Sequence, residues 1–348
     1  MLRNAGRISG NNVRPVSVIG LLVLILLWGW KLSSPAISPT IQSISVQPKL
    51  NTSWHRQISQ EHLATDTNGL TGVNTPLGIL DRTRVAVLIE DRPLPYLIPL
   101  LLHFISVVPM EWSFRFMGSN EAIAMMESNP TVRRYIEAKK LFLDLIPYHL
   151  VQNTNSYDTM NNLLSRPWLY EEWMWPAEWL FLFQDDSMIC SASKLTLNDF
   201  VAGGWSFLGA SSHTHDKPHS TGGGFSLRYV PHLIKQLRTY SFDDWRKDGR
   251  IASEDYYFSM AMWDLPEAKM PLGPEAIRFG VVFEWSEEPG EMPLGFHPFS
   301  SDGMFRGPNG QENQKKAYEY CPELAIISVG RWDCHCSPNS RRPGGLGG

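Results

Sequence analysis

An acidic pair lies one residue after an apolar, aromatic run in this sequence. Trp179 to Phe183 (WLFLF) has the length and composition of a buried strand, and Gln184, Asp185 and Asp186 come next. Ligands of open α/β sheets bind at the carboxyl ends of the strands. Two adjacent carboxylates repel each other unless a positive charge lies beside them, and a divalent cation is the usual partner. The pair therefore predicts a cation site, with a solvated acidic turn as the alternative.

A glycine-rich segment follows later in the chain. Gly222 to Gly224 precede Phe-Ser-Leu and then Arg228. Three glycines let the backbone approach a ligand closely and leave N–H groups that can meet a phosphate, and Arg228 could add positive charge. A tight turn before a helix that starts near Val230 is the alternative explanation.

Two more groups carry titratable side chains. Ser253, Glu254 and Asp255 open an aromatic helix, and either acid could take a proton as a general base. The same residues suit a helix start, because Ser is a good N-cap and acids in the first turn match the helix dipole. His297 lies in a constrained apolar turn, where a histidine is usually structural.

Two weaker metal candidates are a histidine-rich segment and a Cys-His-Cys triplet. Neither has the regular spacing of a metal site, and the first is expected to be a loop beside the site. They comprise His213, His215, His219 and Cys334 to Cys336.

Strand-like and helix-like segments alternate along the chain. This alternation predicts an α/β fold with a mainly parallel, right-handed sheet covered by helices on both faces. The expected strands are 84–89, 112–117, 140–150, 179–183, 200–210 and 280–285, and the expected helices are 97–108, 121–138 with a break at Asn129-Pro130, 160–173 and one from Val230.

The amino terminus reads as a membrane anchor. Residues 1–15 carry three arginines and no acidic residue, and Val16 to Trp30 follows without a charge before Lys31. We expect a cytosolic tail at 1–15 and an uncleaved transmembrane signal anchor at 16–31, because positive charge stays in the cytosol. This predicts a single-pass type II protein of the Golgi or endoplasmic reticulum with a lumenal domain.

The rest of the chain divides by composition. A polar stem at 32–82 contains a glycosylation sequon at Asn51, one domain is expected at 83–330, and 331–348 reads as a disordered tail. The net charge of −4, without a long basic stripe, argues against a nucleic-acid partner. Four cysteines permit disulfides in an oxidising lumen, with the pairing open: Cys190, Cys321, Cys334 and Cys336.

The order of these signals resembles the glycosyltransferase A-type (GT-A) fold, in which a DxD-like acid, a glycine-rich loop, an xED motif and a late histidine surround a nucleotide-sugar. More closely, five motifs resemble a largely fungal family of glycosyltransferase-like proteins classed as a domain of unknown function. They are VAVLIEDRPLP, FLFQDDSMIC, GGGFSLR, SEDYYFS and PLGFHPF, and they lie between Arg84 and Ser300.

The resemblance implies roles for individual residues. Asp186 matches the acid that meets the metal, and His297 matches the late histidine that can complete the metal shell. Gly223 and Gly224 match the loop near donor or acceptor, and Asp255 matches the xED base. The implied cofactor is Mn²⁺ or Mg²⁺.

The remaining matches concern the nucleotide-sugar and the second acid. Glu90 and Arg92 follow the first strand, where such folds hold the nucleotide, and Asp185 and Arg228 are further candidates for binding the nucleotide-sugar. DDS differs from DxD, which leaves open whether one carboxylate or both reach the cation. Glu254 is the alternative base, and a retaining enzyme would need none.

The resemblance implies a membrane-anchored glycosyltransferase that moves a sugar from a nucleotide-sugar, with a UDP-sugar expected, to a hydroxyl of a glycan, protein or lipid. The first alternative is a catalytically inactive module that keeps the fold and binds sugar or protein. The second is a metal-dependent hydrolase of phosphate esters, which paired acids permit.

Overall fold

The computed structural model describes residues 80–146, 157–211, 222–282, 292–298 and 310–328. All of them belong to the second of two compact units, Gly72–Gly348. Several predictions lie outside the described residues, namely the cytosolic tail, the anchor at 16–31, the stem with Asn51, the loop with His213, His215 and His219, and the tail with Cys334 and Cys336. None of the described helices is long and apolar enough to span a membrane.

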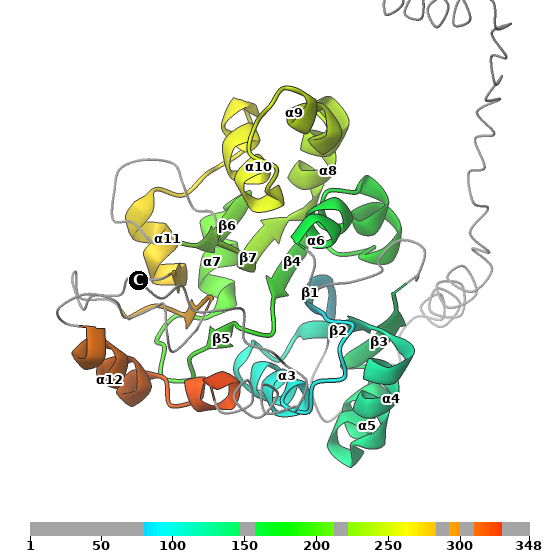
Figure 1. Ribbon diagram of the computed structural model, residues 1–348, viewed down its shortest axis with the longest axis vertical. Helices are drawn as coiled ribbons and strands as arrows, with labels where there is room; N and C mark the ends of the chain where they lie inside the picture. The colour runs from blue at the N-terminus through cyan, green and yellow to red at the C-terminus, as the bar shows by residue number, and fades with distance from the viewer. Residues whose placement is uncertain (1–79, 147–156, 212–221, 283–291, 299–309, 329–348) are drawn as a thin grey trace, which may run out of the picture. The chain divides into compact units, whose positions relative to one another are not determined.

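A six-stranded sheet forms the centre of this unit, with the strand order β3-β2-β1-β4-β7-β6 (Figure 1). Strand β1 is parallel to β2 and β4, and β2 is parallel to β3, whereas β7 is antiparallel to both β4 and β6. Among these six strands only β7 is reversed, so the expected mainly parallel sheet is confirmed. The strands are β1 (Asp81–Ile89), β2 (Trp112–Gly118), β3 (Leu141–Leu145), β4 (Trp179–Phe183), β6 (Phe207–Ala210) and β7 (Gly222–Tyr229).

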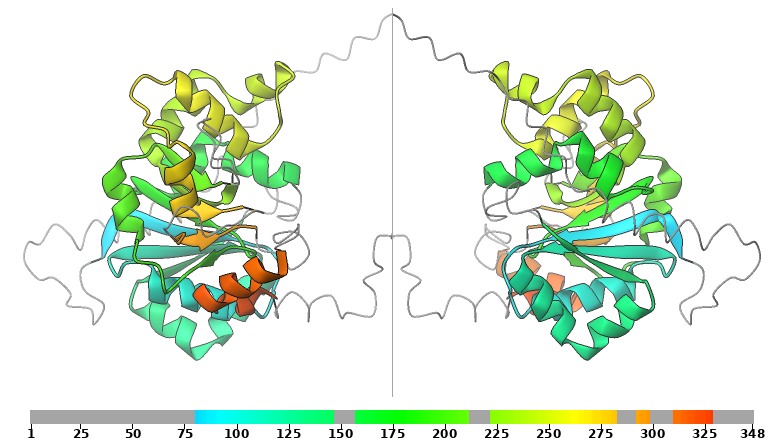
Figure 2. Two further views of the ribbon diagram at one scale, coloured as in Figure 1. Left: turned by 90° about the vertical axis from the view of Figure 1, so that its left-hand side faces the viewer. Right: turned by 90° about the vertical axis from the view of Figure 1, so that its right-hand side faces the viewer.

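Helices cover both faces of the sheet, which explains why β4 is apolar on both sides (Figure 2). Phe181 and Phe183 pack on one face and Leu180 and Leu182 on the other. The first face is covered by α3 (Leu97–Val107), α4 (Asn120–Ser128), α5 (Pro130–Glu137), α7 (Leu197–Gly203), α11 (Gly273–Phe279) and α12 (Gly310–Tyr320). The second is covered by α6 (Tyr157–Leu164), the π-helical turn Leu169–Trp173, α8 (Val230–Thr239), α9 (Phe242–Lys247) and α10 (Glu254–Ala261).

A second, three-stranded sheet has the order β5-β9-β8. Its strands are β5 (Met188–Ile189), β8 (Gly280–Val281) and β9 (Gly295–Phe296). Strand β5 is antiparallel to β9, with Met188 opposite Phe296. Because β5 follows the acidic pair and His297 follows β9, this pairing brings the two predicted metal ligands to the same end of the small sheet.

The predicted helices at 97–108 and 121–138 are confirmed. The break between α4 and α5 is at Asn129, whose side chain accepts hydrogen bonds from the backbone N–H groups of Thr131 and Val132. The alternative explanation of Gly222 to Gly224 as a tight turn is wrong, because these glycines begin strand β7.

Four other segments are shorter or mixed. The expected strand at 200–210 contains the end of α7 and then β6, and the expected helix at 160–173 contains the end of α6 and the π-helical turn. Strand β3 ends at Leu145, and β8 comprises only two residues.

Candidate functional site

The two acids after β4 make contacts with different parts of the molecule. Asp185 is buried, and its Oδ2 accepts hydrogen bonds from Tyr96 Oη at 2.6 Å and from Arg92 Nη2 at 3.2 Å. Asp186 is half-buried, and its Oδ1 lies 3.2 Å from His297 Nδ1. Asp185 is therefore joined to the loop after β1, and Asp186 to the end of β9.

Glu90 and Arg92 form a pair in the loop after β1. Arg92 donates from Nε to Glu90 Oε1 at 2.7 Å and from Nη2 to Glu90 Oε2 at 2.5 Å. Burial raises the pKa of Glu90, and its hydrogen bonds with Arg92 oppose that shift. Burial acts to lower the pKa of Arg92, but the bond to Glu90 and the nearby negative charges raise it overall. The structure thus brings together three of the predicted nucleotide-sugar residues, Glu90, Arg92 and Asp185.

Ser187 connects the acidic loop to β7 and His297. Its hydroxyl donates to the carbonyl oxygen of Gly224 at 2.6 Å, accepts from the N–H of Gln184 at 3.1 Å, and lies 3.1 Å from His297 Nδ1. Because a hydroxyl has one hydrogen and gives it to Gly224, His297 Nδ1 must be the donor in its own contact with Ser187. In the neutral ring, Nε2 is then the nitrogen that carries the lone pair.

Gly224 lies directly against the other edge of His297. A Cβ built on Gly224 would lie 2.2 Å from Gln184 Oε1 and 2.4 Å from His297 Nε2, so any side chain at this position would collide with both. The absence of a side chain at Gly224 therefore allows Gln184 and His297 to lie next to the strand.

Gly223 has the same relation to the first turn of α10. A Cβ there would lie 2.8 Å from Asp255 Cβ and 3.2 Å from Glu254 Oε2. The N–H of Gly223 donates to Asp255 Oδ2 at 3.1 Å, while Tyr256 N–H, at 2.7 Å, and the Ser253 hydroxyl donate to Oδ1. Asp255 is half-buried and is held by these hydrogen bonds beside Gly223.

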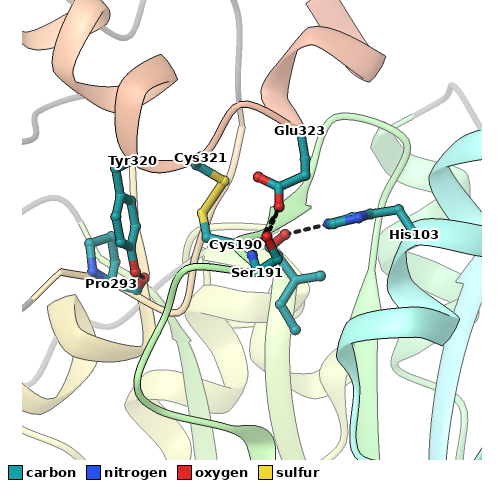
Figure 3. Close-up of a disulfide and its surroundings, with 8 residues drawn as sticks. His103, Cys190, Ser191, Pro293, Tyr320, Cys321 and Glu323 are labelled. Atoms are coloured by element: carbon teal, nitrogen blue, oxygen red, sulfur yellow. Dashed lines mark hydrogen bonds between the residues drawn. A yellow bond between two sulfur atoms is a disulfide. The ribbon is translucent and has the colours of Figure 1, made fainter.

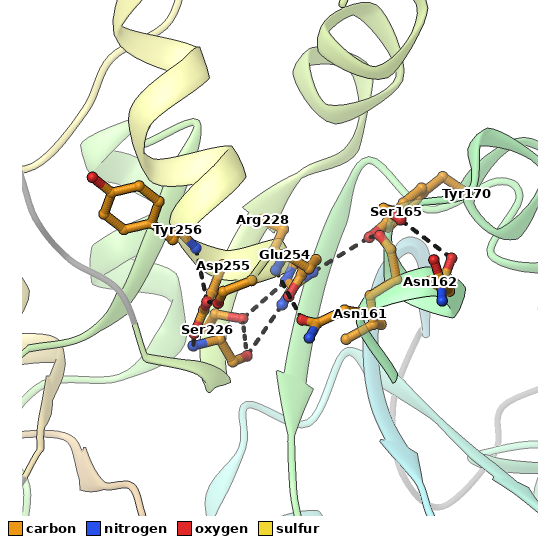
Figure 4. A network of polar contacts seen from close by, with 12 residues as sticks. Asn161, Asn162, Ser165, Tyr170, Ser226, Arg228, Glu254, Asp255 and Tyr256 are labelled. Carbon is orange, nitrogen blue, oxygen red and sulfur yellow. Dashed lines mark hydrogen bonds and ion pairs between the residues drawn. The ribbon is translucent and has the colours of Figure 1, made fainter. Parts of the chain in front are cut away.

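Arg228 and Glu254 form a buried ion pair, shown in Figure 4. Arg228 is fully buried, and its guanidinium also bonds Ser226 Oγ at 2.9 Å, the Gly223 carbonyl at 3.1 Å and Tyr170 Oη at 3.3 Å. Arg228 was predicted to bind a nucleotide-sugar. This prediction needs correction, because the Arg228 side chain is fully buried and its guanidinium bonds groups inside the protein. Its role is to join β7 to the start of α10.

Glu254 is only 3% exposed, in contrast to the half-buried Asp255. Burial raises the pKa of Glu254 to about 7, with the charge of Arg228 acting in the opposite direction. Asn161 Oδ1 accepts the N–H of Glu254 at 2.8 Å, so α6 supplies the cap of α10. Of the two predicted bases, Asp255 is the less buried, while Glu254 holds the helix start in place.

A disulfide links Cys190, next to β5, with Cys321, just after α12 (Figure 3). The N–H of Cys190 also donates to the carbonyl of Leu294 at 2.9 Å, next to β9. The sequence left the pairing of the four cysteines open, and the placement of α12 beside the small sheet decides it for Cys190 and Cys321.

Further contacts fasten the end of α12 to the same sheet (Figure 3). Tyr320 Oη donates to the carbonyl of Pro293 at 2.8 Å, and Glu323 accepts from the N–H of Ser191 at 3.2 Å and from its hydroxyl. The small sheet has Asp186 and His297 at one end, and residues at and just after the end of α12 hold its other end.

Asp186 and His297 fit a divalent cation by the chemistry of their donor atoms. One carboxylate, just before β5, and one imidazole, just after β9, are donors that a divalent cation can accept. Within the described ranges, no group of three or more His, Cys, Asp and Glu side chains is close enough to hold a metal ion. The pair would therefore rely on other donors, such as the oxygens of a bound diphosphate.

Comparison with known proteins gives one family match. Residues 145–297 match the family DUF5672, described as a protein of unknown function. This range contains the acidic pair, the glycines, the start of α10 and His297. No curated protein matches the sequence significantly.

Several solved glycosyltransferases are distantly similar in structure. The apo form of GlyE from Streptococcus pneumoniae TIGR4 has 11% identity and a TM-score of 0.43, over 72% of this chain and 63% of GlyE. Core-mannan synthase A from Aspergillus fumigatus, in its Mn/GDP form, has 8% identity and a TM-score of 0.38, over 53% of this chain and 73% of that one. Galactosyltransferase LgtC with donor and acceptor sugar analogs has 11% identity and a TM-score of 0.34, over 68% and 96%. TM-scores of this size leave the function to be argued from the site itself.

Proposed function

We propose that the chain is a GT-A-like glycosyltransferase that moves a sugar from a UDP-sugar to a hydroxyl of a glycan, protein or lipid, with Mn²⁺ or Mg²⁺ as cofactor. One observation carries the proposal. Gly223 and Gly224 lie between two sets of functional side chains, with Asp255 against Gly223 and His297, paired with Asp186, against Gly224. Two residues without side chains thus separate a cation pair from a candidate base.

The cation pair suits the leaving group of such a reaction. When a sugar leaves a diphosphate, negative charge develops on the diphosphate, and a bound divalent cation neutralises that charge as a Lewis acid. Asp186 and His297 would hold the ion. Arg92, which is partly exposed beside Asp185, supplies further positive charge at the same end of the sheet.

Asp255 suits the acceptor side of the reaction. In an inverting transfer, the acceptor oxygen forms its bond to the anomeric carbon, the diphosphate leaves with the old bonding pair, and a carboxylate takes the hydroxyl proton. Hydrogen bonds from Gly223, Ser253 and Tyr256 fix the orientation of Asp255 for that task. A retaining transfer would need no such base, and the anomeric configuration of the product distinguishes the two.

The test is release of nucleotide by the full chain with Mn²⁺ or Mg²⁺ and a panel of UDP-glucose, UDP-galactose, UDP-N-acetylglucosamine and GDP-mannose. We expect release from one donor that stops on chelation of the metal and in Asp186→Ala. If no donor is cleaved or transferred, with or without candidate acceptors, the transferase proposal is rejected.

An inactive module that keeps the fold is the second candidate, because the hydrogen bonds of Asp255 also explain its place as a helix start. Such a module, tethered to the membrane, would bind sugar or protein without turnover. Donor binding in calorimetry together with absent donor cleavage would favour it.

We further propose that residues 16–31 anchor the protein in the Golgi or endoplasmic reticulum membrane with the catalytic domain in the lumen. The disulfide between Cys190 and Cys321 supports an oxidising compartment. Glycosylation of Asn51 and protease protection in sealed microsomes are the expected results. A mature amino terminus beyond residue 31, or a domain open to protease, would contradict the proposal.

A further inference from the structure

The contact between Asp186 and His297 depends on two very short strands. Asp186 lies two positions before β5, and His297 directly follows β9. Strand β5 is at the edge of the small sheet, and its ladder with β9 comprises two residue pairs. A ladder of this size is too small to be stable by itself. Because a strand rises about 3.3 Å per residue, a slip of one residue would break the contact of 3.2 Å between Asp186 and His297.

Residues 320–323, at and just after the end of α12, hold both strands at the end away from the cation pair (Figure 3). We call this segment the clamp. Two of its contacts lie just after β5 and one lies just before β9; they join Cys321 to Cys190, Glu323 to Ser191 and Tyr320 to Pro293. The first of them is covalent, so it persists when hydrogen bonds open.

Local opening of β5 is the event that the clamp would prevent. Parts of a folded protein open at a much lower free energy than global unfolding requires, and a two-residue edge strand is such a part. Cys190 directly follows β5, so its bond to Cys321 keeps this strand beside β9 while the ladder opens. The apparent affinity for a ligand falls with the fraction of molecules that can bind it. Here that fraction consists of the molecules in which Asp186 faces His297.

We propose that the clamp positions the cation site, with the disulfide holding β5 and Tyr320 holding β9 so that Asp186 stays against His297. The inference rests on the proposed function, because it assumes that this pair binds Mn²⁺ or Mg²⁺. It goes further by making the metal affinity depend on a covalent bond outside the site. The two cysteines act through β5 and are not metal ligands, since both sulfurs are in the disulfide.

The test is calorimetry of Mn²⁺ binding to the full chain in the presence of UDP or GDP. The first variant combines Cys190→Ala with Cys321→Ala, so that neither thiol of the pair is left to form another disulfide. We expect its Mn²⁺ affinity to be roughly tenfold lower or more, the usual effect of losing a group that orients a metal ligand. Melting temperatures are measured first, and calorimetry is run where each protein is folded.

Leu237→Ala is the matched control for lost stability. Leu237 is buried in α8, on the second face of the main sheet. Loss of a disulfide destabilises a protein because it releases the unfolded chain, and loss of a buried leucine also destabilises it. If the disulfide were merely structural, both variants would melt at a lower temperature and bind Mn²⁺ as wild type does.

Tyr320→Phe tests the other half of the clamp and keeps the disulfide. It removes the hydroxyl that donates to the carbonyl of Pro293 at 2.8 Å and leaves the ring in place. We expect a loss of roughly two- to fivefold in Mn²⁺ affinity, the scale of one neutral hydrogen bond. If the double cysteine variant does not fold, this variant decides the question.

Two results would overturn the inference while leaving the proposed function intact. One is Mn²⁺ affinity equal to that of wild type, within about twofold, in the double cysteine variant, or in Tyr320→Phe where the cysteine variant does not fold. The other is an equal loss in Leu237→Ala, because that loss would follow stability and not the clamp. If wild type binds no Mn²⁺ with UDP or GDP, the proposed function itself is rejected, and the role of the clamp with it.

Discussion

Gly224→Ala is the most direct test of whether the side chains beside this glycine form the cation site. Its Cβ would lie 2.2 Å from Gln184 Oε1, 2.3 Å from His297 Cε1 and 2.4 Å from His297 Nε2, whereas ordinary contact begins at 3.4 Å. One methyl group therefore collides with two side chains at once. Both must move away from the strand, and His297 must change its contact with Asp186.

Two effects should follow. Crowding of this kind costs about 1 to 3 kcal/mol of folding free energy, and each kcal/mol lowers the melting temperature of a domain of this size by about 2 to 4 °C. Displacement of a metal-binding histidine from the group that orients it lowers metal affinity by about 10- to 100-fold. We expect both, with the loss of Mn²⁺ affinity measured by calorimetry in the presence of UDP.

Gly249→Ala is the matched control. Gly249 has φ of +71°, and a Cβ there would meet no atom within 4 Å. Placing alanine in this left-handed conformation costs about 1 to 2 kcal/mol. The control should therefore lower the melting temperature without any change in Mn²⁺ affinity.

The neighbouring variant Gly223→Ala should separate the effect on turnover from the effect on Mn²⁺ affinity. Its Cβ would meet Asp255 and Glu254 instead of His297, so it should reduce turnover and leave Mn²⁺ affinity nearly unchanged. The reasoning is refuted if Gly224→Ala lowers the melting temperature yet binds Mn²⁺ as wild type does, because His297 would then lie outside the cation site.

Three further predictions concern the carboxylates. Asp186→Ala should abolish metal-dependent donor binding without unfolding the protein, and Asp185→Ala should cost less; equal affinity of wild type and Asp186→Ala in calorimetry would contradict this. Asp255→Asn should keep nucleotide affinity and lower turnover by roughly 10²-fold, and full turnover would remove Asp255 from the site. Burial raises the pKa of Glu254 from 4.5 to about 7, so the folded state binds the extra proton and stability should fall as pH rises through this range. As pH rises from 4.5 to about 7, the denaturant midpoint should decline less in Glu254→Gln than in wild type. An identical decline in both proteins would reject the raised pKa of Glu254.

The apolar strands and the place of the acidic pair could be predicted from sequence because they are local properties. Five aromatic and aliphatic residues in a row specify β4 in this context, and the residues after such a strand must lie at the sheet edge. The break at Asn129-Pro130 is local in the same sense, since proline begins a helix and asparagine caps it.

Strand β7 could not be predicted from the sequence, because its glycines are required by tertiary contacts. Three glycines have low strand propensity and read as a turn. In the folded chain, Gly223 and Gly224 must be small because Asp255 and His297 lie against them, and these residues are far away in sequence. The burial of Arg228 could not be foreseen for the same reason, since its partner Glu254 comes from a helix start 26 positions later.

The different positions of the two acids in the pair could also be predicted from local geometry. Adjacent residues leaving a strand tend to point in opposite directions, so Asp185 and Asp186 were never equivalent candidates for one cation. In the structure, Asp185 accepts hydrogen bonds from Arg92 and Tyr96, and Asp186 lies next to His297. Only Asp186 is thus next to the histidine, while Asp185 forms an ion pair with the guanidinium of Arg92. Besides Ser187, Gln184 also lies next to His297, two positions before Asp186.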